Sequence, residues 1–109
     1  MRWWIALLAT LWVTPAASQQ PGFHIGNSFY KLCATAHEGP TFVACFAYVQ
    51  GAHDMLNWER GSKLCYAPGV TMQQIYDLLL KAIADDPRKG NFPTIGVLEM
   101  TLSEKFKCP

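Results

Sequence analysis

The most regular alternation of hydrophobic and polar positions in this chain lies between Thr41 and Trp58. Read at about 100° per residue, one side of this stretch is apolar and the other is polar. The apolar side carries Phe42, Cys45, Val49, Ala52 and Leu56, and the polar side carries Gln50, Asp54 and Asn57. Phe46, Tyr48 and Met55 widen the apolar side. The pattern predicts an amphipathic central helix that other helices contact on at least two sides.

Gly51 lies in the middle of this predicted helix. A glycine lowers helix stability by about 1 kcal/mol relative to alanine, because it has more backbone freedom to lose. Two interpretations are equally open. Either another backbone passes close to Gly51, or the glycine is simply tolerated.

Three shorter helices are predicted around the central one. The first runs from about Ser28 to Ala36, and Thr41 is expected to cap the central helix after the break at 37–40. The third begins after Thr71, where Gln74 completes a capping box, and it stops near Asp86 because Pro87 follows. The last helix begins at 92–94 and turns four apolar residues inward, namely Ile95, Leu98, Leu102 and Phe106.

No second domain fits in this length, and the pattern contains no internal repeat. We expect an all-α fold, a compact single-domain bundle of about four helices. The polar, proline- and glycine-containing segment 19–25 is expected to be loosely held before the first helix.

The first eighteen residues have the pattern of a secretory signal peptide. Met1 and Arg2 precede an uncharged apolar run over 3–13, and small residues follow up to Ser18. The run is well short of the roughly 20 residues that span a bilayer. We therefore expect cleavage near residue 18, a mature domain over 19–109, and no membrane anchor after cleavage.

Charge and cysteine content narrow the class of protein. Removing Arg2 with the signal leaves eight of the nine basic residues against eight acidic ones, so no net charge attracts nucleic acid or an anionic membrane. The four cysteines all lie in the mature part, at Cys33, Cys45, Cys65 and Cys108. An even number in a small exported chain predicts two disulfides and an oxidising compartment such as the periplasm.

Candidate catalytic groups are few. A cysteine–histidine hydrolase needs a free thiol, and disulfide formation removes it. The cysteine spacing contains no C-x2-C pair and the histidines no H-x3-H, so zinc is not expected. His53 and Asp54 are adjacent on a helix and point about 100° apart, and Asp85 and Asp86 lie in a turn. We expect neither an enzyme nor a cofactor.

Three sequence blocks resemble a known family. They are GNSFYKLC (26–33), CFAYVQGAHD (45–54) and the segment 65–108, which opens with CYAPGVT and ends on a cysteine. Together they resemble the Rap/Tai family of periplasmic immunity proteins of type VI secretion systems. The chain departs from the family pattern at Lys107, where proline is usual, and at Gly96 and Thr101, where alanines are usual.

The resemblance implies a small helical protein that binds and inhibits a peptidoglycan amidase delivered into the periplasm by neighbouring cells. A homodimer is left open. The alternative is a periplasmic acid-stress chaperone, which unfolds at low pH and exposes apolar surface while disulfides hold the chain together.

Helix topology and loop composition lead to two further expectations. Antiparallel neighbouring helices favour the disulfides Cys33–Cys45 and Cys65–Cys108 among the three pairings that four cysteines allow. A protruding polar run over 59–63 is the expected contact with the amidase, and Asp85 to Asn91 is the second segment to test. The residues assigned to the contact are His53, Asp54, Asn57, Glu59, Arg60 and Lys63. An ordinary solvated connection is an equal alternative.

Overall fold

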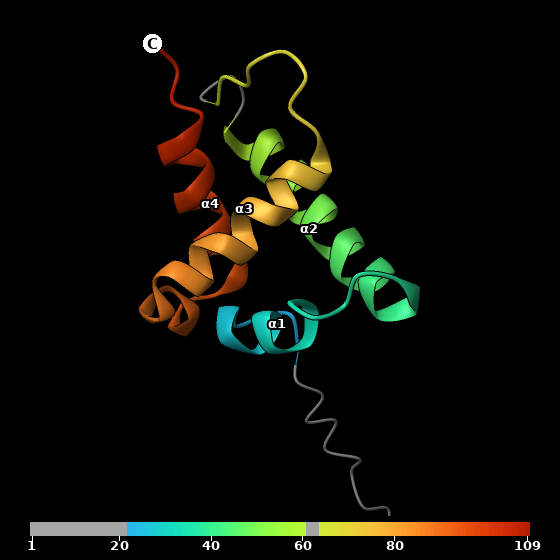
Figure 1. The fold of residues 1–109 in the computed structure, drawn as a ribbon. Coiled ribbons are helices and arrows are strands. Elements are labelled where there is room, and N and C mark those ends of the chain that lie inside the picture. The colour runs from blue at the N-terminus through green and yellow to red at the C-terminus, as the bar shows by residue number, and fades with distance from the viewer. Residues whose placement is uncertain (1–21, 61–63) are drawn as a thin grey trace, which may run out of the picture.

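The structure is a computed structural model that describes residues 22–60 and 64–109 (Figure 1). Within these ranges the chain forms four α-helices, which confirms the predicted all-α fold. They are α1 (Gly26–Cys33), α2 (Gly39–Arg60), α3 (Met72–Asp85) and α4 (Thr94–Lys105), and a 3-10 helix, η2 (Pro87–Asn91), joins α3 to α4. The predicted signal peptide, residues 1–18, lies outside the described residues.

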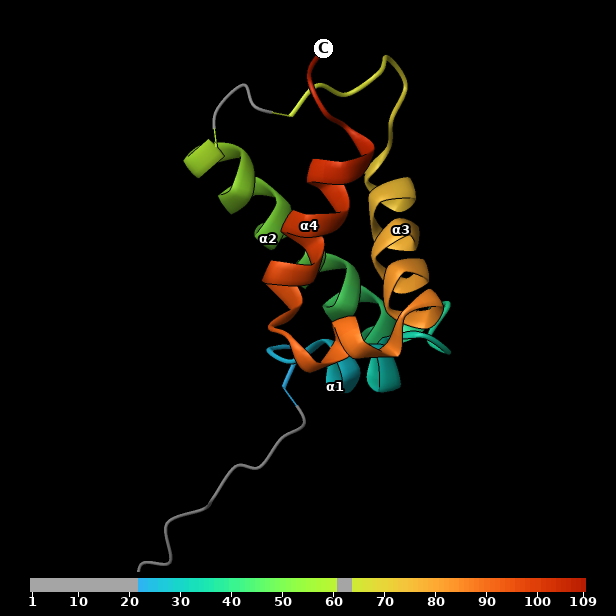
Figure 2. The ribbon, with the colours of Figure 1, turned by 90° about the vertical axis from the view of Figure 1, so that its left-hand side faces the viewer.

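The helices form a bundle that α1 closes at one end. Figure 2 shows α4 between α2 and α3, and α4 packs against both. α1 crosses the end of the bundle, where it contacts α2, α3, α4 and η2. The segment leading into α3 and the C-terminus lie together at the opposite end (Figure 1). The molecule therefore has one closed end and one end formed by connecting segments.

The apolar side predicted for α2 faces the core. Cys45, Val49 and Leu56 are buried there, together with residues of the other three helices. Of the residues that widen this side, Phe46 lies 5.7 Å, between ring centroids, from Tyr76 of α3. Met55 contradicts the prediction, since it is 51% exposed. No other helix covers Met55, which lines an open hollow between α2 and α4 instead.

The two interpretations of Gly51 can now be separated. A Cβ atom built at Gly51 meets no described atom within 4 Å, so the expectation of a close backbone contact is wrong within one molecule. The close approach of backbones occurs between α1 and η2, where a Cβ at Gly26 would lie 3.0 Å from the Gly90 Cα. A side chain at the first residue of α1 would therefore crowd the backbone of η2.

The helix boundaries differ from the predicted ones where tertiary contacts intervene. α1 starts earlier than predicted because the Gly26 amide donates to the Phe92 carbonyl at 3.0 Å, and it ends earlier, at Cys33. α2 starts at Gly39, which has a φ of +83° and is followed by Pro40. Proline suits the first helical turn. Thr41 therefore lies inside the helix, and its predicted capping role is wrong.

The predicted start of α3 is confirmed in atomic detail. The Thr71 hydroxyl accepts from the Gln74 amide at 3.2 Å, and the Gln74 side chain accepts from the Thr71 amide at 2.9 Å. The helix ends at Asp85, as the following proline requires. Asp86 is not merely a solvated turn residue, because its side chain accepts from the Arg88 amide at 3.2 Å and caps η2.

The segment before α1 is held more firmly than predicted. The Phe23 ring stacks on Tyr48 with centroids 5.1 Å apart. Thr94, the first residue of α4, is buried; its amide donates to the His24 carbonyl at 2.7 Å, and its hydroxyl donates to the Phe23 carbonyl. The expectation of a loose lead is wrong for residues 22–25, because α4 satisfies their backbone and α2 covers their aromatic side chain.

Both predicted disulfides are present. Cys33–Cys45 joins the end of α1 to α2, with Cα atoms 5.9 Å apart, and Cys65–Cys108 joins the segment before α3 to the C-terminus, with Cα atoms 4.9 Å apart. Cys33 and Cys45 are completely buried in the core, whereas Cys65 and Cys108 are exposed. One bond is therefore part of the core, and the other ties two surface segments.

Candidate functional site

The residues predicted to contact a partner on α2 face in different directions. The His53 side chain is 12% exposed and its Nε2 lies 2.9 Å from the Tyr66 hydroxyl oxygen. The Asn57 Nδ2 lies 3.2 Å from the same ring nitrogen. The Asp54 side chain is 74% exposed. His53 and Asn57 thus attach α2 to the segment that follows it, while Asp54 faces solvent.

The His53–Asp54 pair is closer than helix geometry alone predicts. The Asp54 carboxylate lies 3.6 Å from the His53 Nδ1, beyond a good hydrogen bond but close enough to attract a protonated imidazole. Because Tyr66 and Asn57 surround Nε2, the pair resembles a structural link rather than a base beside a nucleophile.

Tyr66 is held in a fixed position at the start of the segment that leads to α3. Its ring lies 4.7 Å from the Phe106 ring between centroids, and burial raises the pKa of its hydroxyl. The neighbouring Cys65 donates its amide to the Phe106 carbonyl at 2.9 Å and is bonded to Cys108. A hydrogen bond, an aromatic contact and a disulfide therefore converge on two consecutive residues.

The helix before the predicted loop over 59–63 extends farther than expected. Glu59 and Arg60 belong to the last turn of α2, because no helix-breaking residue precedes Gly61. Glu59 is exposed, and Lys63 lies outside the described residues. Positions 53, 57 and 60 share one side of α2, whereas Glu59 lies about 120° away from His53 around the helix. Among those of the six residues whose side chains the structure describes, His53 and Asn57 lie together, and Glu59 lies on another side of α2.

Two features of this end of the molecule escape sequence reasoning. Tyr66 and Phe106 form its base although forty residues separate them, and no local pattern marks that pairing. Trp58 is 87% exposed on the last turn of α2. The helical pattern places Trp58 at the end of the predicted helix but does not say whether any element covers it.

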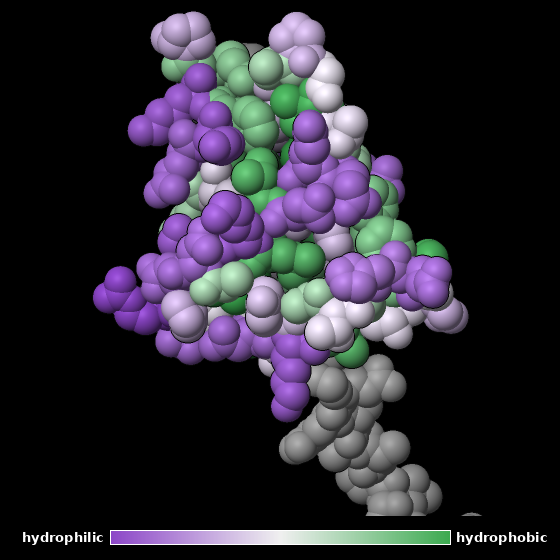
Figure 3. Space-filling view, viewed as in Figure 1, coloured by the Kyte–Doolittle hydropathy of each residue, from purple (hydrophilic) through white to green (hydrophobic). Residues whose placement is uncertain are grey.

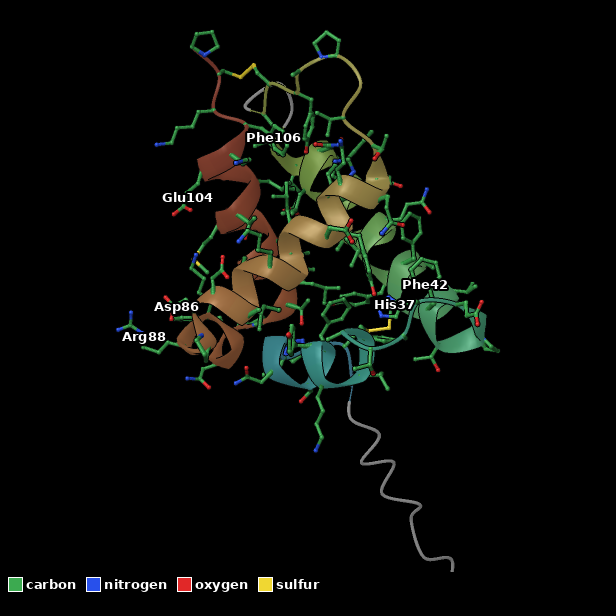
Figure 4. All side chains as sticks on the ribbon, in the orientation of Figure 1. His37, Phe42, Asp86, Arg88, Glu104 and Phe106 are labelled. Carbon is green, nitrogen blue, oxygen red and sulfur yellow. A yellow bond between two sulfur atoms is a disulfide. The ribbon has the colours of Figure 1, made fainter. Side chains whose placement is uncertain are left out.

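The second predicted segment, around η2, carries paired charges. The Arg88 Nε donates to the Asp86 carboxylate at 3.2 Å, which holds the pKa of that carboxyl below its usual range. Lys81 donates to Asp85 at 2.8 Å. Figure 4 shows Asp86 and Arg88 together at the outer corner of the molecule, below Glu104 of α4. The carboxylates are thus balanced by neighbouring cations.

The structure gives little support for a cysteine–histidine hydrolase or for a metal site. Both disulfides engage all four cysteines, so a cysteine–histidine hydrolase lacks its nucleophile. Among residues 22–60 and 64–109, no group of three or more His, Cys, Asp or Glu side chains is arranged to hold a metal ion. In the same part of the chain, none of the helices has the length and apolar character needed to cross a bilayer.

Comparison with known proteins completes this description. No curated protein and no solved structure matches the chain. The family model of the Rap1a immunity proteins matches residues 25–108, which includes every helix and both disulfides. Since this match spans well over half of the sequence, the chain belongs to the Rap1a immunity protein family.

Proposed function

We propose that this protein is a periplasmic immunity protein that binds and inhibits a peptidoglycan amidase delivered by a type VI secretion system. The observation that carries the proposal is the family match over residues 25–108. The export signal predicted over 1–18 and the two disulfides support a location in the oxidising periplasm. A protein placed there meets the amidase where peptidoglycan is exposed to it.

Inhibition proceeds by binding, without catalysis and without a cofactor. The engaged cysteines and the structural role of His53 support this view, because neither leaves an activated nucleophile on the described surface. The inhibition is then stoichiometric, so that one molecule of the protein inhibits one amidase molecule.

The proposed contact surface is the end of the molecule built by α2 and residues 59–63. A segment that enters an enzyme cleft binds more tightly when it is already fixed, because less conformational entropy is lost on binding. Tyr66 and the Cys65–Cys108 bond fix the chain just after this segment, and α2 fixes it just before. Arg60 and Lys63 supply cations for acidic groups at the cleft rim, and Asp54 and Glu59 supply exposed carboxylates.

A homodimer is part of the proposal. Gly51 and Met55 lie exposed on the outward side of α2, and α2 carries no acidic or basic residue before His53. A second copy can therefore approach this side without like-charge repulsion, and Gly51 lets the two backbones come close. A Cβ atom at Gly51 meets no described atom within 4 Å, so Gly51→Leu should shift the mass measured by light scattering from dimer to monomer while leaving the fold intact.

The test of the function uses the mature chain, residues 19–109, and the amidases encoded beside its gene. We expect one of them to co-purify with the protein and to lose its peptidoglycan hydrolysis at a one-to-one ratio. Failure to bind any of these amidases, combined with protection of unfolded proteins at acidic pH, would replace the proposal with the chaperone alternative.

The contact surface is tested with the double variant Arg60→Ala, Lys63→Ala. We expect affinity for the amidase to fall by more than threefold, which corresponds to more than about 0.7 kcal/mol. Lys31→Ala, on the exposed side of α1 at the closed end, is the matched control and should not change affinity. If the double variant stays within threefold while Arg88→Ala, Lys89→Ala weakens binding, the contact lies at η2.

A further inference from the structure

A groove follows the contact between α3 and α4. Its wider part has a volume of about 370 Å³ and an apolar wall formed by Val70, Leu78 and Phe106. A narrower part of about 200 Å³ continues toward η2, and Leu78 and Lys81 line both parts. We call this feature the α3–α4 groove. In Figure 3 its apolar surface is visible between the polar outer sides of α4 and α3.

The charged side chains along the α3–α4 groove differ between its two walls: those of α3 have partners, and two on α4 do not have an ion-pair partner among the described residues. On α3, Lys81 is paired with Asp85 at 2.8 Å, and Asp77 accepts from Gln73 at 3.0 Å. On α4, Lys105 lines the wide part and Glu104 lines the narrow part. Neither of these two has an ion-pair partner among the described residues. The α4 rim therefore offers one cation beside the apolar hollow and one anion farther along.

The groove begins next to the proposed contact surface. Phe106 lines its wide part, and the same ring lies 4.7 Å from Tyr66 between centroids. Tyr66 in turn holds His53 at the end of α2. Figure 4 shows Phe106 at the end of α4, on the side of the molecule where the C-terminus and the segment before α3 meet. An enzyme that contacts the molecule at Tyr66 therefore lies next to the wide part of the groove.

We infer that the α3–α4 groove is a second contact site for the amidase, and that it takes a segment carrying an apolar side chain beside an acidic one, with a basic one farther along. This inference rests on the proposed function. The apolar side chain fills the hollow of Val70, Leu78 and Phe106, as buried anchors do in interfaces. The acidic group meets Lys105 and the basic group meets Glu104, in the order that the rim presents.

Three variants of the mature protein test the groove, with the affinity for its amidase as the readout. Val70→Asp places a charge in the apolar hollow while the Val70 amide keeps its bond to the Ala67 carbonyl at 3.4 Å. Lys105→Glu and Glu104→Lys reverse the two charges on the α4 rim. We expect each to raise the dissociation constant at least tenfold. Lys31→Glu is the matched control, because Lys31 and Lys105 are both basic residues in the last turn of a helix.

The outcomes separate the inference from the function. If the wild type inhibits the amidase while all three variants bind within twofold of it, the groove is not a contact site and the proposed function stands. If the wild type binds no amidase, both the proposed function and the groove inference are wrong. Lys105→Glu and Glu104→Lys change exposed side chains, so their result decides the question even if Val70→Asp fails to fold.

Discussion

The His53 Nε2 lies 2.9 Å from the Tyr66 hydroxyl oxygen, and this contact connects the last two turns of α2 to the segment that leads into α3. The Tyr66 ring simultaneously packs on Phe106 next to the end of α4. One side chain thus joins three elements at the end of the molecule opposite α1. The position of residues 64–66 relative to the bundle depends on it.

Removing the Tyr66 hydroxyl should loosen this junction. We expect Tyr66→Phe to lower the free energy of unfolding in urea by about 1 kcal/mol, the usual net contribution of a hydrogen bond in a protein. Tyr30→Phe is the control, since Tyr30 is also a half-buried residue and its hydroxyl makes no hydrogen bond within the described part of the chain. Equal stability of Tyr66→Phe and wild type would show that the His53 contact contributes nothing to the fold.

Tyr76 should behave in the opposite way. It is 2% exposed, and its hydroxyl is buried without a partner among the described residues. A buried hydroxyl that makes no hydrogen bond destabilises the folded state by about 1 to 3 kcal/mol. We therefore expect Tyr76→Phe to raise the midpoint of urea unfolding, because it keeps the ring contacts with Phe42 and Phe46. A lower midpoint would mean that a water molecule bonds the hydroxyl.

The two disulfides should differ in their sensitivity to reductant. Attack by a thiolate requires access to a sulfur atom. Cys65 and Cys108 are exposed, whereas Cys33 and Cys45 are completely buried. At limiting reductant, alkylation and peptide mapping should find labelled Cys65 and Cys108 first. Prior labelling of Cys33 and Cys45 would contradict the structure.

Replacing the exposed pair also has a predictable effect on stability. The Cys65–Cys108 bond joins residues 43 positions apart. In the chain-entropy model a loop of this size stabilises the fold by about 4 kcal/mol. We expect Cys65→Ala, Cys108→Ala to lose roughly that amount of free energy of unfolding.

Asp86 gives the fold a pH dependence of known sign. The hydrogen bond from the Arg88 side chain lowers the pKa of Asp86 below its ordinary value of 3.8. Asp86 therefore contributes stability that is complete above that value and is lost as the pH falls through the lower folded-state pKa. We expect Asp86→Ala to be less stable than wild type at pH 7, with a difference that shrinks below about pH 4. Arg88→Ala should weaken the same pH dependence, and an unchanged profile would contradict the assignment.

Local sequence signals were sufficient for the helices and caps that depend on neighbouring residues. Thr71 and Gln74 form their capping box within one turn, and the Cys33–Cys45 bond spans only 12 residues. Phe23 and Thr94 show where such signals end. The first looks like part of a loose lead and the second like the opening of the last helix, yet a hydrogen bond joins the two residues across 71 positions of the chain.

The candidate site shows the same division. Helical periodicity places Asp54 and Asn57 on the polar side of α2, and His53 is assigned with them to the expected partner contact. The structure turns His53 toward Tyr66, because a half-buried hydroxyl on a later segment provides a hydrogen-bonding partner there. Helical periodicity describes one helix at a time. It therefore does not predict which side chains of a later segment contact that helix.

The positions of the two disulfides divide the chain into two covalent rings joined by a single thread. A peptide bond broken between Cys33 and Cys45, or between Cys65 and Cys108, leaves one connected molecule, because the disulfide bridges the break. A break between Cys45 and Cys65 separates α1 from α3 and α4, with only packing to hold the halves together. That thread includes the proposed contact residues 53–63, so a protease cut at the contact surface leaves the two halves of the inhibitor without a covalent link.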